Sequence, residues 1–395
     1  TSGIIMTGES GAHNLTPNGV QNLNWSNLSQ YAAMKLVGGQ KINIDNVTIN
    51  YTGTGDTGYQ RWLFHTDGHN DYGESTWVLN NGTSVNMNGT NLVLYTSQYH
   101  SGTNQNANTG FVNDGIITTA GSKNIGWISL NETGNTARQL YFHNRAGSMN
   151  FGGTRDILAY VMSPTAANGG WSFINDGTIK LTGDKSVGVY ITSGGIKTFN
   201  NNNSVELGGS VSAADPSIGI FNNNSQGTVN NSTDMILGEK SIGIYNKGGI
   251  INHTAGDIKI APAGTGIYMN AGNLNLTGGK LLLSGEKTVG IYATNGAVTD
   301  NNAEISVSSG SYGAVLSGNA VYTGRNISHL EDTGVLIYSD GKTTVINETG
   351  ADLNMSGSDS IGFYMINGGD ITNKAAITGD NGTANIGIYN KAGSI

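Results

Sequence analysis

The sequence predicts an all-β protein, a parallel, right-handed β-helix or solenoid with three strands in each coil. One observation is a five-residue motif, Ser-Ile-Gly-Ile-Tyr at Ser241–Tyr245, that recurs along the chain. Its spacing of roughly 25 residues is typical of solenoids. A second observation is that each period holds three short runs rich in β-branched residues, separated by Gly, Asn, Asp and Ser. No helical periodicity fits between these runs, which disfavours helical repeats.

The motif is most regular from about residue 180 onward. Its copies there are Ser186–Tyr190, Ser217–Phe221, Thr288–Tyr292, Ser360–Tyr364 and Asn385–Tyr389. Within one period, Ile250–Asn252 and Ile258–Ile260 supply the other two runs. Each strand is therefore expected to pair in parallel with its counterpart in the next coil, at a separation of about 4.8 Å.

Residues 1–60 lack the motif and are predicted to form an N-terminal cap and the first coil. A solenoid needs its open end covered, because a terminal coil exposes unpaired strand edges. Asn27–Leu36 is predicted to form a helix, with Gly38 just past its end. Lys41–Ile44 and Val47–Tyr51 are expected to start the first coil.

Residues 61–180 are predicted to form β-helix coils with extended loops, and residues 181–395 a regular stalk. Motif-like runs before residue 180 recur at intervals of roughly 30 residues, which leaves about six more residues in each coil. All the tryptophans lie in this part of the chain or before it, and the last of them is Trp171. Extra residues in a solenoid coil form loops on one side, and loops often carry binding, so this half is the predicted binding tip.

The composition argues against several functions. The chain has 61 glycines in 395 residues, 12% charged residues and a formal net charge of -8. Nucleic acid is not an expected partner, because phosphate binding needs a clustered basic face. The absence of cysteine rules out disulfides and thiolate metal sites. No cofactor is expected.

The run at 241–252, Ser-Ile-Gly-Ile-Tyr-Asn-Lys-Gly-Gly-Ile-Ile-Asn, and its copies resemble the passenger repeats of very large fusobacterial type V (autotransporter) adhesins. The resemblance is strong over residues 180–395 and weaker over 110–180. It implies a cell-surface protein, anchored in the outer membrane through a C-terminal barrel not included in this chain, with the N-terminal half at the tip. The implied partners are host glycans of the galactose or N-acetylgalactosamine type, a host immune receptor such as TIGIT, and other bacteria. The fragment itself is expected to be monomeric.

The densest cluster of chemical groups lies at residues 61–74. In an extended strand, four of its side chains would alternate onto one face, with ligand atoms suited to zinc, nickel or manganese. These four are His65, Asp67, His69 and Asp71. Gly68 favours a turn instead, so a ligand-binding loop without a metal and a plain solvated loop are the other interpretations.

A glycan site would need an aromatic platform with planar amide or carboxylate partners, since a sugar offers an apolar face and a rim of hydroxyls. The predicted ligand-binding residues are Trp62, His65, Asp67, His69, Asp71, Tyr72, Trp77, Tyr95, Tyr99 and His100. The alternative for Trp62 and Trp77 is that they fill wider coils.

The favoured function is adhesion or receptor binding by the N-terminal half, without chemistry. One alternative is a β-helical glycan-cleaving enzyme, in which Asp67, Asp71 and Glu74 would supply the paired carboxylates. The other is a purely structural stalk segment.

The recurring tyrosines and asparagines are predicted to be structural. Like residues in successive coils lie in contact, so the tyrosines would stack as a ladder, and the asparagines would form an amide ladder at a corner of the coils, bonding along the stack. The residues are Tyr190, Tyr245, Tyr268, Tyr292, Tyr338, Tyr364 and Tyr389, and Asn252, Asn347 and Asn373.

Overall fold

The structure is a computed structural model. It describes residues 4–7, 11–15, 19–24, 33–37, 39–55, 62–68, 75–99, 109–131, 139–161, 170–192, 196–325, 327–379 and 382–395. All regular elements in these ranges are β-strands. The chain divides into two compact units, residues 1–205 and 206–395.

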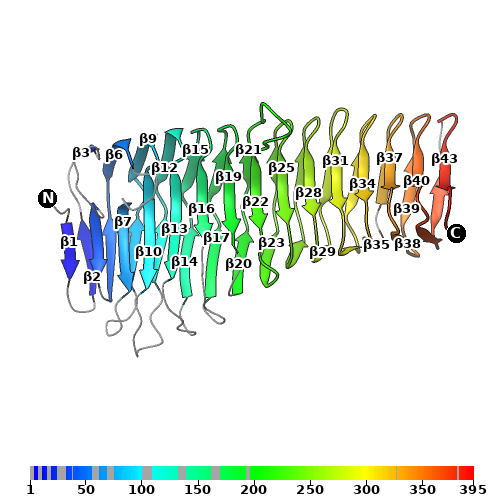
Figure 1. The fold of residues 1–395 in the computed structure, drawn as a ribbon. Coiled ribbons are helices and arrows are strands. Elements are labelled where there is room, and N and C mark those ends of the chain that lie inside the picture. The colour runs from blue at the N-terminus through cyan, green and yellow to red at the C-terminus, as the bar shows by residue number, and fades with distance from the viewer. Residues whose placement is uncertain are drawn as a thin grey trace. The chain divides into compact units, whose positions relative to one another are not determined.

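In the first unit, the strands follow one another along the chain in sets of three. Each strand pairs in parallel with its counterpart in the next set, so that the strands form three sheets, A, B and C (Figure 1). Sheet A contains β1 (Ile4–Thr7), β4 (Met34–Val37), β7 (Trp62–Gly68), β10 (Val93–Tyr99), β13 (Ile125–Asn131), β16 (Ile157–Val161) and β19 (Val187–Ile191). Sheet B contains β2 (Gly11–Leu15), β5 (Gln40–Ile44), β8 (Ser75–Leu79), β11 (Thr109–Asn113), β14 (Gln139–Asn144), β17 (Gly170–Asn175) and β20 (Ile196–Asn201). Sheet C contains β3 (Gly19–Asn24), β6 (Val47–Thr54), β9 (Ser84–Thr90), β12 (Ile116–Ser122), β15 (Ser148–Phe151) and β18 (Thr178–Leu181). Strand β21 (Val205–Leu207) lies at the boundary between the units.

The second unit repeats the same arrangement of strands. Sheet A contains β22 (Ile218–Asn222), β25 (Ile242–Asn246), β28 (Thr265–Met269), β31 (Val289–Ala293), β34 (Tyr312–Leu316), β37 (Val335–Ser339), β40 (Ile361–Met365) and β43 (Ile386–Asn390). Sheet B contains β23 (Gly227–Asn231), β26 (Ile250–His253), β29 (Asn273–Leu276), β32 (Ala297–Asp300), β35 (Val321–Gly324), β38 (Thr344–Asn347) and β41 (Asp370–Asn373). Sheet C contains β24 (Met235–Leu237), β27 (Asp257–Ile260), β30 (Lys280–Leu283), β33 (Glu304–Val307), β36 (Ile327–Leu330), β39 (Asp352–Met355) and β42 (Ala376–Thr378). The prediction of a parallel β-helix with three strands per coil is confirmed.

The pairing register shows two coil lengths. In the second unit, Ile242 pairs with Thr265, and Thr265 pairs in turn with Val289 of the following coil. In the first unit, Val93 pairs with Ile125, and Ile125 pairs in turn with Ile157. The coils of the first unit are therefore longer, and the longer period expected before residue 180 is present.

The Ser-Ile-Gly-Ile-Tyr motif forms one strand of sheet A together with the corner before it. In β25, Ile244 is buried inside the coil, whereas Ile242 and Tyr245 are partly exposed on the outside. The preceding Ser241 is buried, and its hydroxyl donates to the carbonyl oxygen of Gly238 at 2.6 Å. At Gly243 a Cβ atom would lie 2.6 Å from the carbonyl oxygen of Gly266 in the next coil. The motif therefore combines a polar corner, a close backbone approach, one core residue and two outward residues.

Asparagine side chains in successive coils hydrogen-bond to one another along the stack, as predicted, but these ladders occupy two different places in the coil. Asn347 donates to Asn373 across 2.7 Å at a corner of the second unit. Asn252 instead lies on the outer face of sheet B, where it donates to Asn230 and accepts from Asn275, both at 2.8 Å. In the first unit, a corner ladder that the sequence analysis did not single out is fully buried. It runs from Asn113 through Asn144 and Asn175 to Asn201, with distances of 2.9, 2.8 and 2.8 Å.

The predicted helix at Asn27–Leu36 is wrong over its described part. Met34–Leu36 lie in strand β4, which pairs in parallel with β1 and β7. Strands β1–β3 precede the first coil that was expected to start at Lys41, so the stacking of strands begins closer to the N-terminus.

Candidate functional site

In the coils from β7 to β17, the longest connections fall at one corner, between sheets A and B. Strand β7 ends at Gly68 and β8 begins at Ser75, so six residues separate them. The next three connections of this kind contain nine, seven and eight residues, at 100–108, 132–138 and 162–169. In the second unit the equivalent connection after β25 contains three, 247–249. We call this corner, between β7 and β17, the A–B corner.

The residues that form the insertions at the A–B corner lie outside the described part of the chain. They include four of the predicted ligand-binding residues, namely His69, Asp71, Tyr72 and His100. Two more, Asp67 and Tyr99, lie in strands β7 and β10 beside the corner, and only their backbone is described. The glycan-site and catalytic interpretations of these residues therefore remain predictions.

The predicted aromatic platform is not formed by Trp77 and Tyr95. Both side chains are fully buried inside the coils of the first unit. Trp77 packs against Phe64 with ring centroids 5.2 Å apart, and Tyr95 packs against Phe111 at 5.0 Å. The hydroxyl of Tyr95 donates to Thr66 at 3.3 Å, and burial raises the pKa of Tyr95. These rings fill wide coils, which was the alternative considered for Trp77.

Trp62 and His65 are also withdrawn from solvent, although they belong to outward positions of sheet A. Trp62 is 8% exposed and joins a hydrophobic cluster with Val93, Ile125 and Ile128. Its ring stacks on His65, with centroids 4.6 Å apart. His65 is 3% exposed, and its Nδ1 lies 2.7 Å from Thr96 Oγ1. Neither side chain offers an open face to a ligand in this conformation.

No cluster of three or more His, Asp or Glu side chains suited to a metal occurs among the residues that the structure describes. Of the four proposed ligands, His65 is buried against Trp62. Asp67, His69 and Asp71 have no described side chains. The metal interpretation of residues 65–71 therefore gains no support from the described residues.

The outer face of sheet B carries polar and aromatic groups that the sequence analysis did not select. The ring of Tyr141 lies directly over Gly110, where an added Cβ atom would collide with it. Its hydroxyl lies 3.0 Å from the Thr76 hydroxyl, in the coil before that of Gly110. His143 Nε2 lies 2.6 Å from Asp176 Oδ2. The alternation of Tyr141 and His143 on one strand is the signal that sequence reasoning could have used.

Asp176 is the charged centre of this group. Burial opposes its ionisation, but hydrogen bonds from Asn202 and His143 outweigh it and lower the pKa of Asp176. Asn202 Nδ2 donates to the other carboxylate oxygen at 2.8 Å. The carboxylate is thus held in place by two side chains while it stays partly exposed. We call Tyr141, His143, Asp176 and Asn202 the sheet B surface.

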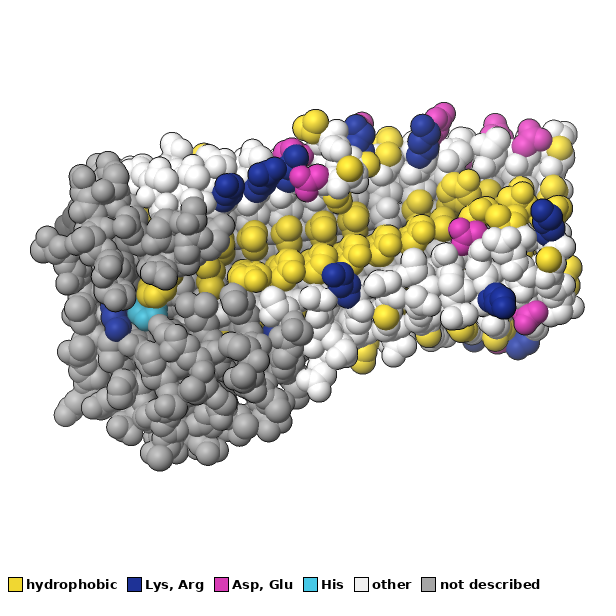
Figure 2. All heavy atoms as spheres, viewed as in Figure 1, with side chains coloured by type: hydrophobic (Ala, Val, Ile, Leu, Met, Phe, Trp, Pro, Cys, Tyr) yellow, Lys and Arg dark blue, Asp and Glu magenta, His cyan; other side chains and the backbone are white. Residues whose placement is uncertain are grey.

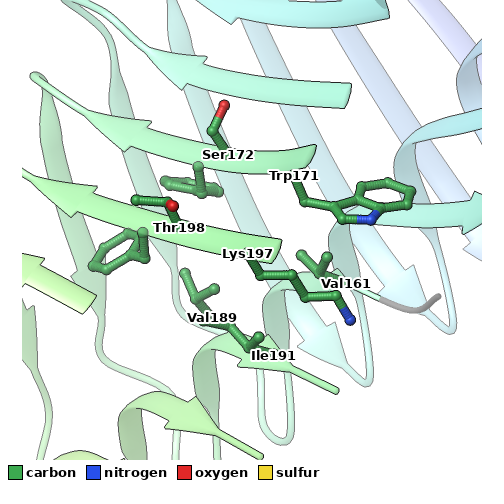
Figure 3. A pocket seen from close by; sticks show the side chains of 9 residues that line it. Val161, Trp171, Ser172, Val189, Ile191, Lys197 and Thr198 are labelled. Atoms are coloured by element: carbon green, nitrogen blue, oxygen red, sulfur yellow. The ribbon is translucent and has the colours of Figure 1, made fainter. Parts of the chain in front are cut away.

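A buried lysine lies inside the coils near the last insertion. Lys197 is 1% exposed and donates to the carbonyl oxygen of Thr192 at 2.8 Å. Burial lowers the pKa of Lys197 to about 8. Figure 3 shows its amine and the indole of Trp171 extending to the same side of a small cavity that Val161 and Val189 also line. Because the amine is enclosed and bonded to backbone, we interpret Lys197 as part of the core.

Comparison of this chain with protein families, with curated proteins and with solved structures finds no match. Within the described residues, no helix is long and apolar enough to cross a membrane.

Proposed function

We propose that the chain is part of a bacterial cell-surface adhesin that binds its ligand through the first unit. The observation that carries this proposal is the A–B corner, where four successive connections are six to nine residues long. A coil of this fold closes with a three-residue connection, as after β25. Long insertions that are repeated at one corner are therefore surplus to folding, and insertions on one side of a solenoid are where such proteins commonly bind.

The sheet B surface adds groups that suit a carbohydrate or a protein. A sugar offers an apolar face to a ring such as Tyr141 and hydroxyls to a carboxylate such as Asp176. His143 and Asn202 hold that carboxylate through hydrogen bonds. Tyrosine and histidine also suit a protein partner, because aromatic groups are enriched at protein interfaces.

The resemblance to fusobacterial type V adhesins supplies the ligand classes of this proposal. They are host glycans that end in galactose or N-acetylgalactosamine and an immune receptor of the TIGIT kind. Outer-membrane anchoring and contact with other bacteria belong to the same proposal. The second unit would then act as the stalk.

A binding screen of the full chain tests the proposal. The chain is applied to a glycan array and to a panel of receptor ectodomains, and free galactose and N-acetylgalactosamine are used as competitors. We expect saturable binding to at least one glycan or receptor. A chain that is folded by circular dichroism and binds neither class would contradict the proposal and favour a purely structural segment.

A substitution on the sheet B surface tests its part in binding. Tyr141→Ala removes an aromatic face and is expected to weaken binding roughly tenfold, equivalent to about 1.4 kcal/mol. Tyr245→Ala in the second unit is the matched control, because Tyr245 is also partly exposed on the outside of a coil. Equal affinity of the Tyr141→Ala variant and the parent chain would remove the sheet B surface from the proposal.

A further inference from the structure

Three tyrosines on the outside of sheet A in the second unit stack as parallel plates. Tyr245, Tyr268 and Tyr292 lie in consecutive strands β25, β28 and β31, and each is partly exposed. The ring centroids of Tyr245 and Tyr268 are 4.6 Å apart with an interplanar angle of 7°, and those of Tyr268 and Tyr292 are 4.9 Å apart with an angle of 8°. Figure 2 shows hydrophobic side chains gathered in rows on this face.

The backbone fixes which rings meet. Tyr245 is paired with Tyr268 in the strand register, and Tyr268 is paired with Tyr292. Slipping the register by one residue would turn the outward side chains to the interior, so the pairs cannot exchange while the coils are folded. Each tyrosine therefore keeps the same ring neighbour.

Other tyrosine pairs in the same sheet are not parallel. The rings of Tyr338 and Tyr364 are 5.7 Å apart and inclined at 54°, and those of Tyr364 and Tyr389 are 5.1 Å apart at 52°. The column of tyrosines is interrupted at Val315, which pairs with Tyr292 on one side and Tyr338 on the other. The parallel stack thus forms a defined segment of three phenols.

Parallel phenols have the geometry that radical coupling requires. When a phenol loses one electron and one proton, the unpaired electron spreads onto the two ring carbons next to the C–O bond. Two such radicals join through the orbital lobes of these carbons, which project perpendicular to the rings. The rings of Tyr245, Tyr268 and Tyr292 are nearly parallel, so these lobes run in one direction from ring to ring, whereas in the tilted pairs they are inclined to one another.

We propose that this stack is a site of oxidative modification, at which Tyr268 is joined to Tyr245 or Tyr292 as dityrosine within one chain. The co-substrate is hydrogen peroxide used by a one-electron haem peroxidase. Each of two phenols gives up one electron and one proton, and a carbon–carbon bond forms between their rings. The hydrogen on each newly bonded carbon then moves to the phenol oxygen. The peroxide takes up the two electrons and two protons and leaves as two molecules of water.

The modification would supply a covalent link between coils in a chain that has no cysteine. A link between Tyr245 and Tyr268 joins paired residues of two adjacent coils. Such a link removes conformations from the unfolded chain, as a disulfide does, and is expected to raise the melting temperature. The proposal is independent of the binding proposed for the first unit.

Peptide mapping of the oxidised full chain tests the proposal. Dilute chain is treated with haem peroxidase and hydrogen peroxide, and the products are followed by dityrosine fluorescence and by mass spectrometry of peptides. We expect a monomeric product that has lost two hydrogens and contains a cross-linked peptide pair with Tyr268. Cross-links found mainly between separate chains, or mainly at the tilted pairs, would overturn the proposal.

Matched phenylalanine variants separate coupling from folding. Tyr268→Phe removes the shared phenol and should abolish the cross-linked peptides while the stack is kept. A phenyl ring is already accepted in this column, because Phe221 stacks on Tyr245 at 4.8 Å and 9°. Tyr364→Phe is the control and should leave the yield of these peptides unchanged. Equal loss in both variants, with unchanged circular dichroism, would contradict the assignment to the parallel stack.

Discussion

The hydroxyl of Tyr322 donates a hydrogen bond to Oδ2 of Asp300 across 3.3 Å, and both side chains are buried in the second unit. Asp300 ends strand β32, and its Oδ1 accepts from the backbone N–H of Ala303 at 2.9 Å. Burial raises the pKa of Asp300 to about 6, against the lowering effect of these hydrogen bonds. A buried carboxyl whose pKa is raised makes the stability of this unit depend on pH.

We predict that Asp300→Asn stabilises the chain at neutral pH. Because the folded-state pKa is raised, Asp300 favours folding below its unfolded pKa near 3.8, and this contribution is lost as pH rises through about 6. Asparagine keeps the shape without the charge, so the variant should gain about 1–3 kcal/mol at pH 7.5 and little at pH 4. Urea unfolding at both values of pH checks this. The substitution Asp352→Asn at an exposed position serves as control. A gain in stability that does not change with pH would refute the assignment of the effect to the Asp300 carboxyl.

Removing one side chain from the buried asparagine ladder of the first unit should destabilise the chain. Asn144 accepts from Asn113 and donates to Asn175, so Asn144→Ala leaves two buried amides without their partner. We expect a loss of about 2–4 kcal/mol in the free energy of unfolding. Asn252→Ala removes an equivalent member of the partly exposed ladder, where water can replace it, and should cost about 1 kcal/mol or less. Equal losses of stability in the two variants would show that burial does not determine how much a ladder contributes to stability.

The glycine of the recurring motif should not tolerate a methyl group. At Gly266 a Cβ atom would lie 2.6 Å from the carbonyl oxygen of Gly290 and 2.7 Å from Cδ1 of Ile260. Gly266→Ala is therefore expected to destabilise the chain by about 2–4 kcal/mol through steric crowding. At Gly209 the nearest atom would be 3.4 Å away, so Gly209→Ala should change stability by less than about 1 kcal/mol. Thermal unfolding of both variants tests this prediction. A Gly266→Ala chain as stable as the parent chain would contradict the steric explanation.

Most of the fold could be predicted from the sequence because the repeat is local and regular. The motif at Ser241–Tyr245 and the two further runs in its period predict three strands in one coil, and these are present as β25, β26 and β27. Met34–Leu36 could not be assigned correctly, because a short apolar run fits a helix or a strand until its pairing partner is known. The partner is β7, whose Phe64 and His65 pair with Met34 and Lys35.

The candidate site was harder to predict than the fold. Trp77 and Tyr95 were expected to form an aromatic platform, yet both fill the interior of wide coils. Sequence alone cannot decide this, because a widened coil accepts large rings inside it as readily as a loop presents them outside. Tyr141 was missed because its position depends on Gly110 in the preceding coil, which leaves room for the ring.

The location of binding is tested most directly by shortening one connection at the A–B corner. Residues 100–108 are replaced by Lys-Gly-Gly, the three-residue connection found at 247–249, in the full chain. The control chain carries Gly-Gly-Gly at 247–249. Affinity for the best glycan or receptor from the screen is then measured for both chains and the parent, together with circular dichroism. We predict a loss of affinity of about tenfold or more in the shortened chain only. Full affinity in a folded shortened chain, or loss in the control alone, would contradict binding at this corner.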